Sequence, residues 1–377
     1  MTLIETVTRQ VLGSPLIEAL AWPHGVDRYL ELIKPHWSLS ELRGTITAVS
    51  YPTAETVALT VRPSANWAGH LAGQHVNVGV TIDGTIHTRC YSVTDAEPAP
   101  DGATPAEFGL CIKSHPEGLV SKYLAAHATV GMSVLLGPAE GTFTLPDTRP
   151  ERTVLISGGS GITPVLSMLR TLCARGHDRP VSFVHYSFGP HDALYADEVA
   201  GLAAKYPNVT SVRAYTDHHA GDLTGLFRLG HLDAVDPEWR QSEIFLCGPP
   251  GLMGAVTEVV DAAGRAEHLH TERFELARIP NDADRASATG TVTFVGDGAG
   301  PAGTVTLDNS GEPLLVQAEK AGLTPVYGCR MGICHTCTRP KKTGCVRNAV
   351  TGQLSDLGAE DIQICISAPV GDVVVDL

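Results

Sequence analysis

The sequence predicts a multidomain chain in which an antiparallel β-barrel, an α/β domain with a parallel sheet and a compact α+β domain follow one another. A length of 377 residues exceeds what a single ordinary core organises. Short runs at period two fill residues 41–148, whereas apolar strands alternate with helical patterns over 149–277. A polar, turn-rich linker at 278–287 then precedes a last unit at 288–377.

The bulk composition excludes several classes of protein. A hydrophobic content of 43% with 39 Gly and 25 Pro is typical of a globular, turn-rich chain. The net charge of −14 argues against nucleic acid as a partner, because phosphate binding needs a basic face. No apolar run is long enough to span a bilayer, and the start MTLIETVTRQVLG lacks the pattern of a secretory signal. Nine cysteines, an odd number, favour reduced thiols or metal ligands over disulfides, so we expect a cytoplasmic protein.

The elements of the first two regions follow from periodicity. Residues 1–40 carry scattered apolar positions between prolines and predict an N-terminal helical extension. In 41–148, the runs GTITAVS, TVALTVR, HVNVGVTIDGTIHTRCYSV and SVLLGP predict strands of an antiparallel barrel, with a two-residue hairpin turn at Asp83-Gly84.

From residue 149 onward, the predicted secondary structure changes from successive strands to strands that alternate with helices. Between 149 and 277, the apolar runs TVLISGG, VSFVHYS, TSVRAYT and EIFLCGPP alternate with helical patterns, which predicts a parallel sheet with crossovers. Beyond the linker, GTVTFVG, GTVTLDN, the helical PLLVQAEKAG and the closing GDVVVDL make up the third domain.

A cysteine-rich loop lies in this third domain. Cys329, Cys334 and Cys337 have the spacing C-x4-C-x2-C, and Cys365 follows 28 residues later. This is the plant-type spacing for a 2Fe–2S cluster, whose irons select thiolate ligands. A structural zinc site and a redox pair at 334/337 are the alternatives, although zinc sites favour two C-x2-C knuckles. GCRMGICHTC and CISAPVGDVVVDL together resemble the plant-type ferredoxin family, which implies a β-grasp domain over 288–377 with these four cysteines as ligands and Cys345 as an extra thiol.

A flavin site is indicated in the barrel. HTRCYSV places the fork of Arg89, which suits a diphosphate, on the same strand face as Tyr91, which can cover a flavin ring next to the hydroxyl of Ser92. An ordinary strand with one exposed Arg is the alternative. CIKSHPEGLVSKYL adds a helix start suited to a pyrophosphate. Together they resemble the flavin barrel of the ferredoxin–NADP reductase superfamily, which implies FAD bound by Arg89, Cys90, Tyr91, Ser92, Ile112, Lys113, Gly118, Leu119, Val120 and Ser121.

A pyridine-nucleotide site is indicated in the α/β domain. LISGGSGITP is a glycine turn between a buried strand and a helix, and FLCGPPGLM ends a second strand at the carboxyl edge, where such sheets bind ligands. The pair resembles the nucleotide lobe of the same superfamily, where the Cys lies near the nicotinamide, and HTERF matches its closing strand. A core cysteine is the alternative role for Cys247. The implied nucleotide-binding residues are Gly159, Gly161, Ile162, Thr163, Pro164, Ser187, Cys247, Gly248 and Pro249, and the resemblance places Phe274, the last residue of HTERF, by the flavin.

The choice between NADPH and NADH is less clear from the sequence than the presence of a pyridine-nucleotide site. No Asp or Glu directly follows Ser187 to bind a ribose hydroxyl, and this serine could meet a 2′-phosphate. The Arg that accompanies such a serine in NADPH-preferring relatives is absent, so the sequence leans to NADPH and leaves NADH open.

The domain order over 41–377 resembles the reductase components of multi-component oxygenases, desaturases and hydroxylases. The resemblance implies electron flow from NAD(P)H through FAD and the cluster to an external acceptor, with Tyr91, Ser92 and Cys247 at the reacting centre. Residues 20–42 resemble an extension in actinobacterial partners of membrane fatty-acid desaturases, so we expect such an acceptor and peripheral membrane contact on docking. A ring-hydroxylating or phenylacetyl-CoA-type oxygenase is the alternative acceptor, and a redox sensor the alternative function. A basic docking patch is a further hypothesis, made of Arg330, Arg339, Lys341, Lys342 and Arg347.

Overall fold

The computed structural model describes residues 41–99, 106–116, 118–148, 150–217, 219–274, 288–296, 303–328, 330, 332 and 335–377. The predicted N-terminal extension, the predicted linker, Cys329 and Cys334 lie outside these residues. The chain forms two compact units, Met1–Arg273 and Phe274–Leu377. Among the helices that the structure describes, none has the length and apolarity needed to cross a bilayer.

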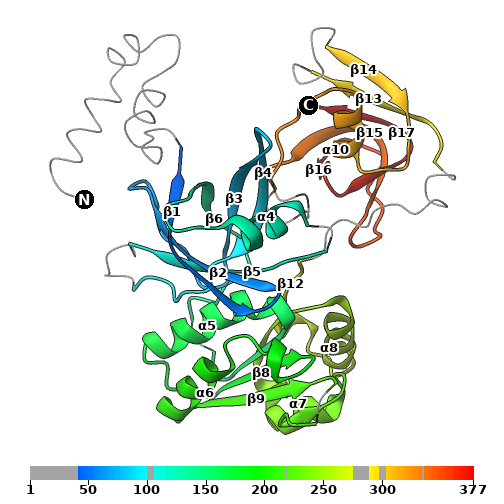
Figure 1. The fold of residues 1–377 in the computed structure, drawn as a ribbon. Coiled ribbons are helices and arrows are strands. Elements are labelled where there is room, and N and C mark those ends of the chain that lie inside the picture. Colours follow the sequence, from blue (N-terminus) through cyan, green and yellow to red (C-terminus); the bar gives the residue numbers. More distant parts are fainter. Residues whose placement is uncertain are drawn as a thin grey trace. The chain divides into compact units, whose positions relative to one another are not determined.

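The first sheet of unit 1 is the predicted antiparallel one, drawn blue to cyan in Figure 1. Its strand order is β4-β3-β6-β1-β2-β5, and alternate residues point into an apolar core. A bridge between Val93 and Leu110 joins the two outer strands, which closes the sheet into a barrel. The elements are β1 (Arg43–Thr53), β2 (Thr56–Pro63), β3 (His75–Ile82), β4 (Thr85–Ser92), β5 (Phe108–Lys113), α4 (Leu119–His127) and β6 (Ser133–Glu140).

The hairpin that carries the flavin motif turns where the sequence predicts. Asp83 and Gly84 connect β3 to β4 with φ of 50° and 79°. Two consecutive residues with positive φ match the twist of the flanking strands, which is why an Asp-Gly pair is favoured there. The turn sets the register that pairs His75 with Ser92.

The second sheet of unit 1 confirms the predicted parallel α/β arrangement, with helices around it (Figure 1). The order β10-β9-β8-β7-β11-β12 is parallel throughout. The strands are β7 (Thr153–Gly158), β8 (Val181–Ser187), β9 (Val209–Tyr215), β10 (Leu223–Thr224), β11 (Glu243–Cys247) and β12 (Leu269–Glu272). The helices are α5 (Ile162–Ala174), α6 (Ala196–Lys205), α7 (Leu229–Val235) and α8 (Pro250–Ala262), with short turns η1 (Gly159–Gly161), η2 (Pro190–Asp192), η3 (Trp239–Gln241) and η4 (Ala266–His268).

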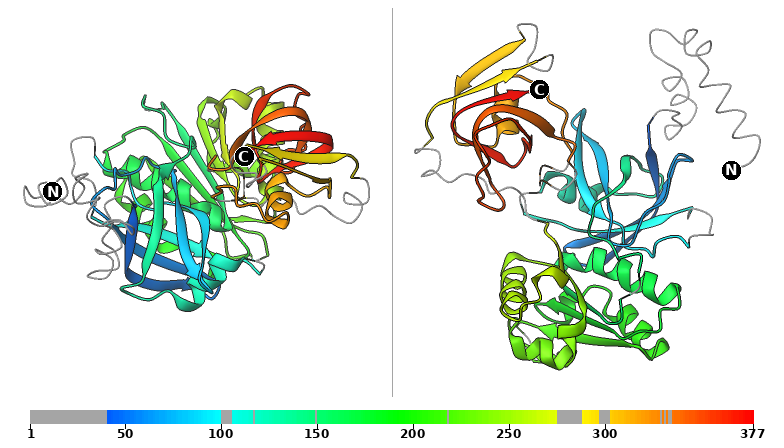
Figure 2. Two further views of the ribbon diagram at one scale, coloured as in Figure 1. Left: turned by 90° about the horizontal axis from the view of Figure 1, so that it is seen from above. Right: turned by 180° about the vertical axis from the view of Figure 1, so that it is seen from behind.

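The described residues of unit 2 form a mixed five-stranded sheet and one helix, coloured yellow to red in Figure 2. In the order β14-β13-β17-β15-β16, only β13 and β17 are parallel neighbours. The helix packs on the sheet through Leu314, Leu315 and Ala318. The elements are β13 (Thr291–Val295), β14 (Thr304–Asp308), α10 (Leu314–Lys320), β15 (Thr338–Asn348), β16 (Glu360–Gln363) and β17 (Ser367–Asp376).

The position of Lys341 contradicts its assignment to the hypothetical basic docking patch, because this residue is buried. Its side chain is 0% exposed, and its Nζ donates hydrogen bonds to the carbonyl oxygens of Gly344, Asp356 and Gly358 at 2.8, 2.8 and 2.5 Å. The carboxylate of Glu360 lies 3.1 Å from the same ammonium. A buried ammonium is tolerated only when its protons are satisfied in this way, so Lys341 ties the segment 344–360 to the sheet.

We expect Lys341→Met to destabilise unit 2 by about 3 kcal/mol, because it removes a charge-assisted donor and leaves buried carbonyls unsatisfied. Urea-dependent hydrogen exchange should show the loss in peptides from 338–377. Lys342→Met is the matched control, since Lys342 is 53% exposed and pairs with Asp376 at the surface. Equal exchange in both variants would contradict a structural role for Lys341.

Candidate functional site

The predicted flavin strand β4 places Arg89 and Tyr91 on one face and Ser92 on the other. Arg89 is half-buried and donates from Nη1 to the carbonyl of Thr88 at 2.7 Å. Burial raises the pKa of the Tyr91 phenol, and the charge of Arg89 partly offsets that rise. Ser92 is 3% exposed, and its hydroxyl has no hydrogen-bond partner among the described residues. A buried hydroxyl of this kind needs a partner, so Ser92 fits a flavin that would complete it.

The other residues predicted to bind FAD lie on β4, on β5 and at the start of α4. At the start of α4, Ser121 accepts a hydrogen bond from the His115 N–H at 3.2 Å, and a Cβ built at Gly118 would lie 2.3 Å from the Ser121 Oγ. Cys90 and Ile112 are buried in the barrel, the former donating to Asn77 at 3.1 Å. Lys113 pairs with Glu55 at 3.4 Å, Leu119 is exposed and Val120 is buried.

The two predicted nucleotide motifs touch each other. A Cβ built at Gly161 would lie 2.3 Å from the carbonyl oxygen of Cys247 and 2.7 Å from the amide nitrogen of Gly248. Only glycine fits such a backbone-to-backbone approach. Gly159 has φ of +53° and faces open space, and Thr163 donates to the Ser160 carbonyl at 3.1 Å. The glycine turn is therefore held against the end of β11, with Pro164 in the first turn of α5.

The remaining nucleotide-site residues have separate surroundings. Cys247 is fully buried, and burial raises the pKa of its thiol well above the usual value, with a further contribution from the Glu272 carboxylate. The Cys247 thiol is therefore protonated at neutral pH. Ser187 donates to the carbonyl of Gly189 at 3.1 Å, which closes its own turn. Pro249 precedes α8. Phe274, which is predicted to lie by the flavin, is half-buried two residues beyond β12.

Two of the four predicted cluster ligands lie among the described residues. Cys337 and Cys365 are 1% and 4% exposed and belong to one apolar core of unit 2. Gly332, in the loop before Cys337, has φ of +76°, and its carbonyl accepts from the Gln363 side chain at 2.8 Å. Cys345 sits on β15, where its thiol donates to the Ser355 carbonyl at 3.4 Å. This contact fits the expectation that Cys345 is an extra thiol.

Comparison with known proteins decides the family. The Oxidoreductase FAD-binding domain matches residues 46–144, and the Oxidoreductase NAD-binding domain matches 155–258. The NADPH oxidoreductase of Mycobacterium tuberculosis (strain H37Rv) is 36% identical over 353 residues, 93% of this chain and 88% of that protein. The chain belongs to the ferredoxin reductase-type oxidoreductases. It is an oxidoreductase with an FAD-binding and an NAD(P)H-binding domain.

Other relatives are reductase components of oxygenases. The ferredoxin reductase component of 3-ketosteroid-9-alpha-monooxygenase from Mycolicibacterium smegmatis is 30% identical over 85% of this chain and 92% of its own. Among solved structures, phthalate dioxygenase reductase has a TM-score of 0.62 at 20% identity, covering 90% of this chain and 98% of its own. This last likeness concerns the fold.

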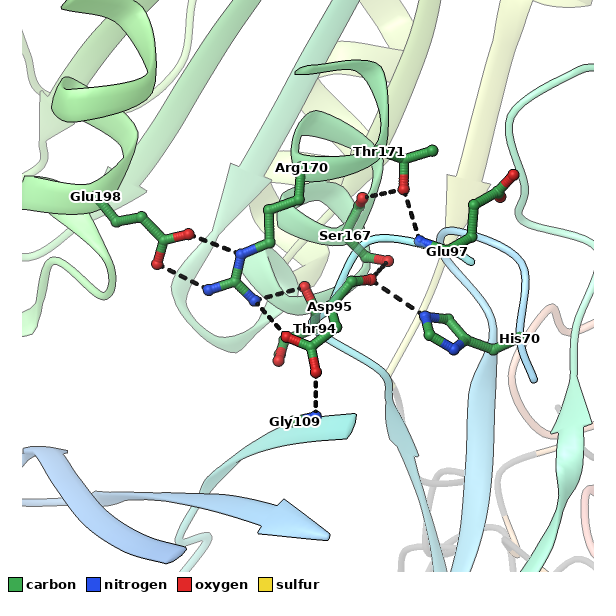
Figure 3. A network of polar contacts seen from close by, with 9 residues as sticks. All are labelled: His70, Thr94, Asp95, Glu97, Gly109, Ser167, Arg170, Thr171 and Glu198. Carbon is green, nitrogen blue, oxygen red and sulfur yellow. Dashed lines mark hydrogen bonds and ion pairs between the residues drawn. The ribbon is translucent and has the colours of Figure 1, made fainter. Parts of the chain in front are cut away.

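A polar network that the sequence did not indicate connects the β-barrel and the parallel-sheet domain of unit 1 (Figure 3). Its hub is Arg170 on α5, which donates to the carbonyl of Thr94 at 2.8 Å and to the carboxylate of Asp95 at 3.2 Å, just beyond the flavin strand. The same guanidinium makes two 2.7 Å hydrogen bonds to Glu198 on α6 and lies over the ring of Tyr195. Arg170 therefore ties the barrel to two helices of the nucleotide domain.

The segment that follows β4 makes further hydrogen bonds, to α5 and to His70. The carbonyl of Asp95 accepts from Ser167 at 2.5 Å and from His70 at 3.2 Å. The backbone N–H of Glu97 donates to Thr171 at 2.9 Å. Ser167, Arg170 and Thr171 all lie on α5, the helix that begins at the glycine turn. The network (Figure 3) therefore joins the segment after β4 to α5, the helix that follows the glycine turn.

We expect Arg170→Met to lower the free energy of unfolding of unit 1 by about 2 kcal/mol. The value lies below that of a fully buried pair, because Asp95 and Glu198 are 44% and 38% exposed and partly screened by solvent. Thermal unfolding followed by tryptophan fluorescence measures the change. Arg179→Met, which removes an exposed pair with Glu151, is the control and should have almost no effect. Equal losses in the two variants would argue against the network.

Proposed function

We propose that this reductase takes electrons from NADPH and passes them through FAD and a 2Fe–2S cluster to an external oxygenase-type acceptor. The observation that carries the proposal is the contact of the glycine turn with the end of β11. That contact brings both nucleotide motifs to one carboxyl edge of the parallel sheet, where such sheets bind their ligands.

The residues of the chain have distinct parts in this proposal. FAD, when bound, supplies a carrier that accepts an electron pair and can release the electrons singly. Arg89 provides positive charge for the diphosphate, Tyr91 an aromatic cover and Ser92 a hydroxyl inside the site. Cys247 presents a neutral thiol at the nucleotide edge, so that no charge repels the coenzyme there.

The cluster is proposed for unit 2. The C-x4-C-x2-C spacing and the resemblance to plant-type ferredoxins support it, and so does the common burial of Cys337 and Cys365. Cys329 and Cys334 would complete the ligand set. A mixed sheet with one packed helix is compatible with a β-grasp domain.

NADPH is the proposed coenzyme. Ser187 ends β8, where the sequence offers no carboxylate for a ribose hydroxyl, and a relative at 36% identity is named NADPH oxidoreductase. NADH is the alternative coenzyme, because the Ser187 hydroxyl already donates a hydrogen bond to the Gly189 carbonyl.

The proposed acceptor is a membrane fatty-acid desaturase or hydroxylase, on the basis of residues 20–42. An oxygenase component is the second candidate, and it is supported by relatives named as reductase subunits of glycine betaine monooxygenase and 3-ketosteroid-9-alpha-monooxygenase. Reconstitution with each type of acceptor discriminates between them through product formation per NADPH consumed.

We expect Gly161→Ala to weaken NADPH binding by about tenfold to a hundredfold, because the added methyl group collides with the backbone of Cys247 and displaces the turn. Equilibrium titration of the flavin absorbance with NADP+ measures the affinity. Gly254→Ala on α8, where a Cβ meets nothing within 4 Å, is the control and should bind normally. Unchanged affinity in Gly161→Ala would place the coenzyme elsewhere.

Anaerobic stopped-flow reduction by NADPH and NADH tests the proposed electron path. We expect the flavin band to bleach first and the iron–sulfur band second, faster with NADPH. Cys365→Ser should lose the second phase and the bound iron while keeping the first, whereas Cys345→Ser should keep both. Iron retained in Cys365→Ser, or the absence of iron from the wild type, would contradict the proposed 2Fe–2S cluster. A flavin that neither NADPH nor NADH reduces would favour the alternative function, a redox sensor.

A further inference from the structure

A tight turn connects β16 to β17 and carries Cys365. The Ile366 N–H donates to the Gln363 carbonyl at 3.0 Å, which closes this turn. The Ile364 N–H donates to the carbonyl of Cys337 at 3.3 Å. The backbone therefore joins the turn of the fourth predicted cluster ligand directly to the third predicted ligand.

The side chain of Gln363 reaches from this turn to the cysteine-rich loop. Its amide group donates to the carbonyl of Gly332 at 2.8 Å, although the two residues are 31 positions apart. Gly332 has φ of +76°, and a Cβ built there would collide with the Ile366 side chain, so the loop and the turn are in direct contact. Gln363 is half-buried and ends β16. It thus lies where the loop that contains three predicted ligands meets the turn that contains the fourth.

A second contact holds the same loop at a different point. The Arg330 guanidinium donates to both carboxylate oxygens of Glu319 on α10, at 3.0 Å for the Nη1–Oε2 pair. It also lies 3.9 Å from the centre of the Tyr327 ring. These contacts join the loop to the helix and to its own start. The hydrogen bond of Gln363 therefore adds a link to the turn of Cys365 that Arg330 does not make.

We propose that Gln363 is a positioning residue for the iron–sulfur cluster, and that its amide influences the retention and the reduction potential of the cluster through the Gly332 carbonyl. The inference rests on the proposed function, because it presupposes a cluster on the four predicted cysteines. Groups that bond to the surroundings of metal ligands orient those ligands, and hydrogen bonds near a cluster tune its potential.

The partial charges give the proposal a sign. The side-chain N–H of Gln363 places positive charge beside the loop and compensates part of the dipole of the Gly332 carbonyl. Leucine at position 363 removes this donor and leaves the carbonyl uncompensated, whereas glutamate adds a full negative charge on a side chain of the same length. Reduction brings an electron to the cluster, so both changes oppose it, the second more strongly.

The test uses the full chain loaded with FAD and with the cluster. The readouts are the reduction potential of the cluster in an anaerobic titration, the EPR spectrum of the reduced cluster and the rate of iron release to a chelator. The variants are Gln363→Leu and Gln363→Glu. Gln353→Leu is the matched control, since Gln353 lies in the same unit, is exposed and makes its hydrogen bonds through the backbone.

We expect the equilibrium constant for reduction of the cluster to fall by about threefold to tenfold in Gln363→Leu, the worth of one hydrogen bond, and further in Gln363→Glu. Iron release should be about tenfold faster in both variants. Gln353→Leu should match the wild type. A structural role alone would lower the stability of unit 2 and leave the potential and the EPR spectrum unchanged.

A potential that stays in place or rises in both Gln363 variants overturns the inference. If neither variant retains iron, hydrogen exchange in unit 2 decides. Exchange like that of the wild type supports a role at the cluster, whereas a general loss of protection overturns it, because Gln363 would then be needed for the fold. A wild type without iron overturns the proposed cluster itself, and the inference with it.

Discussion

The approach of the glycine turn to the end of β11 is the constraint on which the rest of unit 1 depends. Because Gly161 lies against the backbone of Cys247, the end of β11 and the start of α5 are in direct contact. Arg170, two turns further along α5, then carries that position to the segment after the flavin strand. The placement of the predicted flavin strand relative to the glycine turn thus depends on this backbone contact together with the hydrogen bonds of Arg170.

Sequence periodicity predicted the antiparallel and parallel sheets of this reductase because their signals are local. The strands of 41–148 alternate at period two, and Asp83-Gly84 adopts the two positive φ angles that its hairpin needs. The G-G-x-G and C-G-P motifs were found for the same reason, since each lies within a few residues. The assignments of individual residues to FAD, the coenzyme and the cluster stay predictions.

What the sequence could not reveal depends on contacts between distant residues. The sequence around Arg170 does not indicate its partner Asp95, which is 75 positions away. His75 begins an apolar strand and Glu272 lies in the distant HTERF run, although His75 Nδ1 and Glu272 Oε1 are 3.5 Å apart. Lys341 was placed on a basic surface because it has charged neighbours in sequence, whereas the pleat of β15 turns it inward.

The end of β12 has a consequence for how such chains can be recombined. Glu272 is the last residue of that strand, and the boundary of unit 1 follows at Arg273. The glycine turn, the end of β11 and the hydrogen bonds of Arg170 therefore all precede the boundary, and a chimera joined after Arg273 would inherit these contacts intact. Such a chimera would keep the contact of the glycine turn with the end of β11 within one uninterrupted segment.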